Sequence, residues 1–136
     1  MHMLVRDVMS RGVVTCGLDA SIEEISKRLH AAKASAIVVV NALGEVAGII
    51  SVTDLARAFV TSQLDQCAED IMTHDVATIV PDIPIKAAVQ LMLDRKIHQL
   101  VILHAKPAPA RPVGMLSLDD IVRVLANPER FTKTDT

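Results

Sequence analysis

The chain carries the same sequence pattern twice, and this repeat limits the folds that it can adopt. Residues 5–41 align without a gap with residues 68–104, and the match resumes after a short insertion at 106–111. A tandem repeat of this length is typical of two copies of one supersecondary unit that bury their apolar faces together. Neither half, at about 60 residues, is expected to bury a stable core alone. Matched pairs include Asp7 and Asp70, Thr15 and Thr78, Gly48 and Gly114, Ser51 and Ser117, and Asp54 and Asp120.

The repeat also sets the expected domain boundaries. We predict a first repeat at residues 1–62, a linker at 63–67, a second repeat at 68–126 and a polar tail at 127–136. The insertion in the second repeat is rich in proline and is expected to form an exposed loop. Each repeat begins with an opening segment, Val5–Met9 or Ala68–Met72, which precedes the first predicted strand.

Hydrophobic periodicity predicts the order β-α-β-β-α in each repeat, and therefore an α/β chain of the α+β type. Apolar residues at helical spacing follow a capping box, Ser21 with Glu24, and continuous apolar runs predict strands covered on both faces. In the second repeat, Pro84 is expected in the first helical turn. The predicted helical stripe is Ile22, Ile25, Leu29 and Ala32; the predicted strands are Val13–Thr15, Ile37–Val40, Val46–Ile50, Val76–Ile79, Leu100–Leu103 and Val113–Leu116; the closing helices are Val52–Thr61 and Leu118–Ala126.

Composition argues against several classes of protein. The formal net charge is −2 and aromatic residues make up 1% of the chain, so nothing points to nucleic acid as a partner. The apolar runs are far shorter than the ~20 residues of a membrane span, and residues 1–7 lack the apolar region of a signal peptide. We therefore expect a cytoplasmic protein with no membrane partner. Cys16, Cys67 and the scattered histidines match no ligand spacing, so no metal site is predicted.

The motif Gly-x-x-Ser-x-x-Asp occurs once in each repeat, where the last strand passes into the closing helix. In the first repeat it comprises Gly48, Ser51 and Asp54. The start of a helix offers free backbone N–H groups to an anion such as phosphate, and a carboxylate in the same turn can accept hydrogen bonds from ribose hydroxyls. The same Ser-x-x-Asp spacing is also a plain capping box, which satisfies those N–H groups without any ligand. The motif alone leaves both interpretations open.

The order of the motifs resembles the CBS domain, and two copies in tandem resemble a Bateman module. The resemblance rests on Asp-Val-Met9, Val13-x-Thr15, the run Ala36–Val40 and the Gly-x-x-Ser-x-x-Asp motif, each with its counterpart in the second repeat, and it covers residues 5–126. It implies two repeats packed with pseudo-twofold symmetry, with two clefts between them that can hold adenosine-containing ligands. It also implies ligand sensing rather than catalysis.

The implied function is a regulatory module that senses AMP, ADP or ATP, with or without Mg²⁺, ahead of S-adenosylmethionine or NAD. No cofactor is required, and no enzyme activity is expected because the chain has no nucleophile–base arrangement and no Gly-rich phosphate loop. The alternative is a non-catalytic assembly module without a nucleotide ligand, in which Ser51 and Ser117 serve only as helix caps. The ligand-binding residues that the resemblance implies are Thr15, Cys16, Ser51, Thr53, Asp54, Thr78, Ile79, His98, Ser117 and Asp120.

Partners follow from the same observations. A mean hydropathy of +0.38 in so small a chain predicts self-association, and the resemblance implies a homodimer formed through helix faces. A regulatory module further implies an unidentified protein whose behaviour it controls. Arg57 and Arg123, one turn after the two motif aspartates, are expected to pair with those carboxylates at i, i+3.

Two departures from the family pattern affect the second repeat. Gln99 follows His98 where the family often has a cation, which weakens the expected grip on phosphate. Asp119 stands where the first repeat has Thr53. An unpaired carboxylate near a phosphate costs about 1–4 kcal/mol at effective dielectrics between water and a protein surface. We therefore predict that the cleft of the first motif is the better site for AMP or ATP.

Overall fold

The chain folds into two compact units, whose boundaries differ from those of the sequence repeats. The computed structural model describes residues 3–104, 111–127 and 129, so the expected loop at 106–111 and tail at 127–136 lie largely outside the described residues. One unit, here called the central unit, comprises Val13–Val76. The other, the terminal unit, combines the described parts of Met1–Gly12 and Ala77–Thr136.

The central unit contains one mixed sheet and three helices. The first strand runs parallel to the second, because the long helix connects them, and a hairpin makes the third strand antiparallel. The strand order is β1-β2-β3. The elements are β1 (Thr15–Gly17), α2 (Ile22–Ala32), β2 (Ala36–Val40), β3 (Val46–Ser51), α3 (Val52–Val60) and α4 (Ala68–Ile71).

The terminal unit repeats this topology, with sheet order β4-β5-β6. Its first two strands are parallel and its last two antiparallel. The elements are α1 (Val5–Val8), β4 (Thr78–Ile79), α5 (Ile85–Arg95), β5 (Gln99–Leu103), β6 (Pro112–Ser117) and α6 (Leu118–Ala126). The predicted α+β class and the order of strands and long helices are confirmed in both units.

Three local predictions are corrected by the structure. The first strand of each repeat begins later than expected, at Thr15 and Thr78, because parallel pairing with the next strand starts only there. Ala32 is exposed, since the buried stripe of α2 ends at Leu29. Pro84 is the N-cap of α5 rather than part of its first turn, and its ψ of 138° is extended.

Each unit has its own aliphatic core, which is formed by side chains from its strands and helices. The continuous apolar strands β2 and β5 are covered on both faces, as predicted. The buried core of the central unit is Cys16, Ala20, Ile25, Leu29, Ile37, Val39, Ile50 and Ala68, and that of the terminal unit is Val5, Val8, Met9, Ala88, Met92, Leu100, Ile102 and Leu116.

These cores explain why repeats and units differ: the opening segment of each repeat packs in the unit formed by the other. The Val5 N–H donates to the carbonyl of Ile83 (2.8 Å), and Ser10 and Met115 exchange two backbone hydrogen bonds (2.8 and 2.9 Å). In the central unit, Thr73 and Ile49 exchange an equivalent pair of backbone hydrogen bonds (2.9 and 3.1 Å). Helices α1 and α4 are therefore exchanged between the repeats.

Two motif glycines make this exchange possible. A Cβ on Gly48 would lie 2.9 Å from the carbonyl oxygen of Thr73 and closer still to the side chain of Met72. A Cβ on Gly114 would lie 2.8 Å from the carbonyl oxygen of Ser10. Both glycines are thus required because the exchanged segment crosses directly over the last strand.

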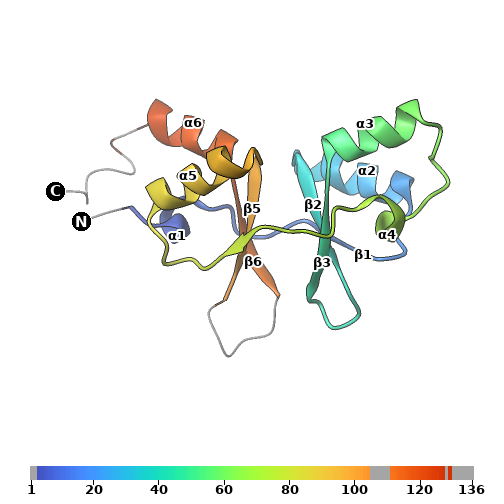
Figure 1. The fold of residues 1–136 in the computed structure, drawn as a ribbon, viewed down its shortest axis with the longest axis horizontal. Helices are drawn as coiled ribbons and strands as arrows, with labels where there is room; N and C mark the ends of the chain where they lie inside the picture. The colour runs from blue at the N-terminus through green and yellow to red at the C-terminus, as the bar shows by residue number, and fades with distance from the viewer. Residues whose placement is uncertain (1–2, 105–110, 128, 130–136) are drawn as a thin grey trace. The chain divides into compact units, whose positions relative to one another are not determined.

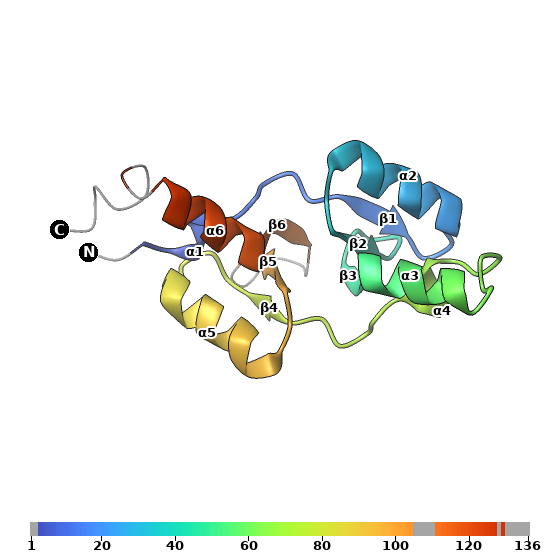
Figure 2. The same cartoon turned by 90° about the horizontal axis from the view of Figure 1, so that it is seen from above.

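Within each unit, the two long helices lie side by side near one end of the sheet. Figures 1 and 2 show α2 beside α3 in the central unit and α5 beside α6 in the terminal unit. The turn between β2 and β3 projects away from α2 and α3 (Figure 1). The ends of β3 and β6, where the Ser-x-x-Asp motifs begin, are therefore at the helix end of each sheet.

Candidate functional site

In the central unit, the motif aspartate caps the helix that it begins. The backbone N–H of Ser51 donates to Asp54 Oδ2 (2.8 Å), and the Ser51 hydroxyl donates to the same oxygen (3.1 Å). The Asp54 N–H lies 3.3 Å from Ser51 Oγ, which completes the capping box. Arg57 Nη1 reaches Asp54 Oδ1 at 3.3 Å, and its side chain is 65% exposed.

The terminal unit repeats the carboxylate contacts with tighter restraint. The Ser117 N–H donates to Asp120 Oδ2 (2.8 Å), and Arg123 Nη2 lies 3.0 Å from Asp120 Oδ1. The same guanidinium nitrogen also donates to the carbonyl of Val8 (3.1 Å), on the exchanged segment. Asp120 is buried, whereas Asp54 is partly exposed. The predicted pairing of both arginines with these aspartates is confirmed.

The register of the central sheet places Thr15 at the same end of the sheet as this motif. Ala36 pairs with Ser51, while Thr15 pairs with Val38, two residues further along β2. Thr15 and Ser51 therefore lie on the two outer strands, toward the end of the sheet where α3 begins. Thr53 is exposed in the first turn of α3.

Cys16, the next residue of β1, is buried in the core. Burial raises the pKa of its thiol, against a smaller lowering by the nearby Arg28. A buried, protonated thiol can pack against an apolar group but is a poor nucleophile.

The terminal sheet places its counterparts in the same way. Gln99 pairs with Ser117, and Thr78 pairs with Val101, again two residues further along the middle strand. His98 is exposed, and its carbonyl accepts the N–H of Leu118 (3.1 Å), so its backbone lies against the start of α6. Ile79 is partly buried in the terminal core.

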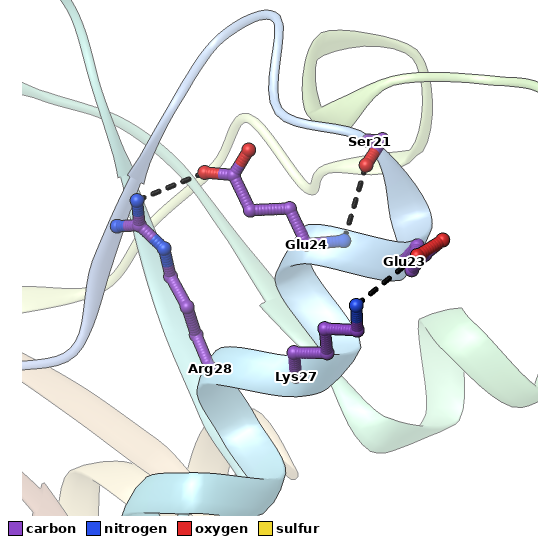
Figure 3. Close-up of a pocket in the computed structure, with 5 residues that line it drawn as sticks. All are labelled: Ser21, Glu23, Glu24, Lys27 and Arg28. Carbon is purple, nitrogen blue, oxygen red and sulfur yellow. Dashed lines mark hydrogen bonds and ion pairs between the residues drawn. The ribbon is translucent and has the colours of Figure 1, made fainter.

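The first turn of α2 forms a shallow pocket (Figure 3). The polar side chains that line it form hydrogen bonds and ion pairs with one another. The Glu24 N–H donates to Ser21 Oγ (3.1 Å), which is half of the predicted capping box. The Glu24 carboxylate pairs instead with Arg28 (2.9 Å). Arg28 also donates to the carbonyl of Thr15 (2.6 Å), a contact next to the candidate site that the sequence analysis missed.

Neither a metal centre nor a membrane span is found in the part of the chain that the structure describes. No group of three or more His, Cys, Asp or Glu side chains there could hold a metal ion. Among the same residues, every helix is too short or too polar to cross a bilayer.

Comparison with known proteins identifies the family. The family model for the CBS domain matches residues 5–61 and 68–127. The chain belongs to the CBS domain family and contains two copies of the domain, as its repeat and motifs suggest.

Solved structures agree with this assignment. The CBS domain pair of protein MJ0100, in complex with 5′-methylthioadenosine and S-adenosyl-L-methionine, is 26% identical to this chain, with a TM-score of 0.85. The alignment covers 94% of this chain and 99% of that one. The CBS-domain containing protein ATU1752 from Agrobacterium tumefaciens is 29% identical, with a TM-score of 0.79, over 92% of this chain and 95% of that one.

Curated relatives are longer proteins. A homoserine O-acetyltransferase from Methanococcoides burtonii is 33% identical over 126 residues, which cover 91% of this chain but 24% of that protein. The uncharacterized protein MK0525 from Methanopyrus kandleri is 29% identical over 88% of this chain and 61% of its own length. The match to the acetyltransferase is thus confined to a region of the size of a CBS pair.

Proposed function

We propose that this chain is a regulatory module that binds an adenosine-containing ligand where the Ser-x-x-Asp motifs begin α3 and α6. The observation that carries the proposal is the likeness, over almost the whole of both chains, to a CBS domain pair in complex with 5′-methylthioadenosine and S-adenosyl-L-methionine. Ser51, Asp54, Ser117 and Asp120 supply oxygen acceptors at two helix starts, which suit the hydroxyls of a ribose.

The central unit is the better of the two sites on physical grounds. A ribose diol must share or displace the arginine that occupies Oδ1 of each aspartate. The Arg57–Asp54 contact is long and its guanidinium is mostly exposed, so solvent and salt screen the arginine side of this ion pair. Arg123 is held by both Asp120 and the Val8 carbonyl, so displacing it breaks two hydrogen bonds.

The remaining site residues have supporting roles in this proposal. Thr15 and Cys16 in the central unit, and Thr78 and Ile79 in the terminal unit, offer backbone groups and small or apolar side chains to an adenine. We expect Thr53, in the first turn of α3, and His98, at the start of α6, to contact phosphate oxygens. AMP, ADP and ATP remain the ligands that we expect for the central site, because no second carboxylate stands beside Asp54.

The proposal includes a homodimer and an unidentified regulated protein in the cytoplasm. Apolar side chains lie exposed on both closing helices, including Phe59 and Val60 on α3 and Leu125 on α6, and exposed apolar patches are typical of protein interfaces. Regulation requires that the ligand bind two conformations of the module with different affinity.

The test is thermal unfolding of the intact chain with AMP, ADP, ATP, NAD, S-adenosylmethionine and 5′-methylthioadenosine, each with and without Mg²⁺. A ligand at 100 times its dissociation constant stabilises the folded chain by about 2.7 kcal/mol, which raises the Tm by roughly 9 °C for a chain of this size. The shift should disappear in Asp54→Asn and persist in Asp7→Asn, whose carboxylate also accepts a backbone N–H at a helix start. If no ligand shifts the Tm, the chain is an assembly module and its motifs are helix caps.

A further inference from the structure

Helix α1 ends against the side chain of Arg123. The carbonyl of Val8, the last residue of α1, accepts a hydrogen bond from Arg123 Nη2 (3.1 Å). The last carbonyls of a helix have no donor within the helix, and an arginine side chain is a suitable partner for them. Backbone hydrogen bonds hold the segment on either side of this contact, at Val5 and at Ser10. Arg123 is therefore one of the groups that dock α1 in the terminal unit.

The same nitrogen of Arg123 also lies 3.0 Å from Asp120 Oδ1. The side chain of Asp120 is 7% exposed, compared with 14% for Asp54, and its Oδ2 accepts the Ser117 N–H. A ligand hydroxyl therefore reaches Oδ1 only when the guanidinium moves away. Because one nitrogen serves both acceptors, a shift that frees Oδ1 also breaks the hydrogen bond to Val8.

The corresponding arginine of the central unit is less restrained. The Arg57 side chain is 65% exposed, compared with 48% for Arg123, and it lies 3.3 Å from Asp54 Oδ1. Because this ion pair lies within α3, breaking it is a local change. The two motif aspartates therefore differ in what a ligand must disturb in order to bind.

We propose that Arg123 makes ligand binding at Asp120 compete with the docking of α1. The inference rests on the proposed ligand site at Asp120. When a ribose hydroxyl takes Asp120 Oδ1, Arg123 leaves the Val8 carbonyl, and residues 5–10 open more often from the terminal core. The docked and opened forms are two conformations to which the ligand binds with different affinity, as regulation requires.

The competition acts equally in both directions. By linkage, the ligand weakens the docking of α1 by the same factor by which docking weakens ligand binding. Couplings between two sites typically correspond to factors of about 5–150. The proposal therefore predicts two measurable changes of similar size, one in the opening of α1 and one in ligand affinity.

Amide hydrogen exchange of the intact chain measures the opening of α1. An Asp54→Asn background removes the motif carboxylate of the central unit. The probe is 5′-methylthioadenosine in excess, because it has no phosphate that Asp119 would repel. The reporters are the amides of Met9 and Ser10, which donate to backbone carbonyls in the docked segment.

We expect the probe to speed exchange at Met9 and Ser10 about fivefold or more. The sign is informative, because a ligand that only stabilises the folded chain slows exchange. The matched controls are the amides of Met72 and Thr73, which hold the same positions on the other exchanged segment and also donate to backbone carbonyls. Their exchange should not become faster.

Removal of the arginine tests the competition from the other direction. In the same background, Arg123→Met should bind 5′-methylthioadenosine about fivefold or more tightly in calorimetric titration, and should speed exchange at Met9 and Ser10 without any ligand. Arg57→Met is the matched control and should change neither quantity. The exchange measurement with the probe keeps Arg123, so it does not depend on how well Arg123→Met folds.

The outcomes separate this inference from the proposed function. Binding of the probe to Asp54→Asn with unchanged or slower exchange at Met9 and Ser10 would overturn the competition and leave the ligand site intact. If the probe binds neither Asp54→Asn nor the same chain with Arg123→Met, the competition and the proposed site at Asp120 are both overturned. Binding that is detected only after Arg123→Met would support the competition.

Discussion

The two units share one scaffold but differ in how tightly it holds the motif aspartate. Asp54 is bound by an exposed arginine at 3.3 Å, whereas Asp120 is buried and its arginine, at 3.0 Å, is also anchored to the Val8 carbonyl. The Ser–Asp contact of 2.8 Å is the same in both. The two units therefore share the same helix cap but differ in how readily its carboxylate can bind a ligand. That difference depends on residues outside the motif.

The units also differ in their surroundings. Beside Thr15 the central unit has the ion pair of Glu24 and Arg28, whereas the matching positions of α5 are the apolar Ala87 and Leu91. Asp119 adds a negative charge to the start of α6 that α3 lacks. The absence of a second carboxylate at the start of α3 favours an anionic ligand in the central unit over the terminal unit.

The largest expected effect concerns the exchange of α1 and α4 between the repeats. A fragment of residues 13–76 keeps α4 on β3 and the buried Ala68, whereas a fragment of residues 1–62 loses both and exposes Val5 and Val8. A fragment of this size is only marginally stable alone, but 13–76 retains its complete core, so we expect it to unfold cooperatively at low temperature in circular dichroism melts and 1–62 to give no transition. Equal behaviour of the two fragments would show that the exchanged segments do not define the units.

The next largest effect is expected from replacing the glycine that lies against the exchanged segment in each unit. We expect Gly48→Ala and Gly114→Ala each to lower the free energy of unfolding by about 1–3 kcal/mol, because each Cβ meets a backbone carbonyl. Urea unfolding measures the loss. Gly17→Ala is the control, since its Cβ would meet only a side-chain oxygen of Asp19 at 3.3 Å. A loss in only one of the two variants would mean that the units are not equivalent there.

A smaller effect is expected from exchanging Thr53 and Asp119, the residues by which the starts of α3 and α6 differ in charge. Thr53→Asp should weaken ATP binding about tenfold, because a carboxylate is placed near the phosphates. Binding of 5′-methylthioadenosine, which has no phosphate, should change little. Asp119→Thr is the matched variant and should strengthen ATP binding at the terminal unit. Calorimetric titration measures both; equal effects on the two ligands would contradict an electrostatic cause.

The smallest effect is a dependence of stability on pH at the start of α4. The backbone N–H of Cys67 donates to the Asp70 carboxylate, and the Cys67 thiol donates to it as well. Both hydrogen bonds, the backbone one more strongly, lower the pKa of that carboxyl below its usual range. The folded state therefore binds this proton less readily than the unfolded state. Its stabilisation is present above the ordinary pKa of aspartate, about 3.9, and is lost as the pH falls through the lower folded value.

Urea unfolding of Asp70→Asn tests this. The variant should be less stable than the wild type at pH 6 and should approach it at pH 3. A difference that does not change with pH would exclude the carboxylate as its source.

Local features of the fold could be predicted from the sequence because they depend on neighbours in the chain. The stripe of Ile22, Ile25 and Leu29, the apolar middle strands and the pairing of Arg57 with Asp54 are of this kind. The exchange of opening segments is not, because Val5–Met9 and Ala68–Met72 have similar patterns and either could pack on either sheet. The anchoring of Arg123 depends on that exchange and on a backbone carbonyl, which no side-chain pattern reveals.

The central claim is that Asp54 holds an adenosine-containing ligand more readily than Asp120. Calorimetric titration of the intact chain with AMP and with S-adenosylmethionine, in the wild type, Asp54→Asn and Asp120→Asn, tests it most directly. We predict that the tightest binding step is lost in Asp54→Asn and retained in Asp120→Asn. Wild-type binding by Asp54→Asn, or loss of the tightest step only in Asp120→Asn, would contradict the account.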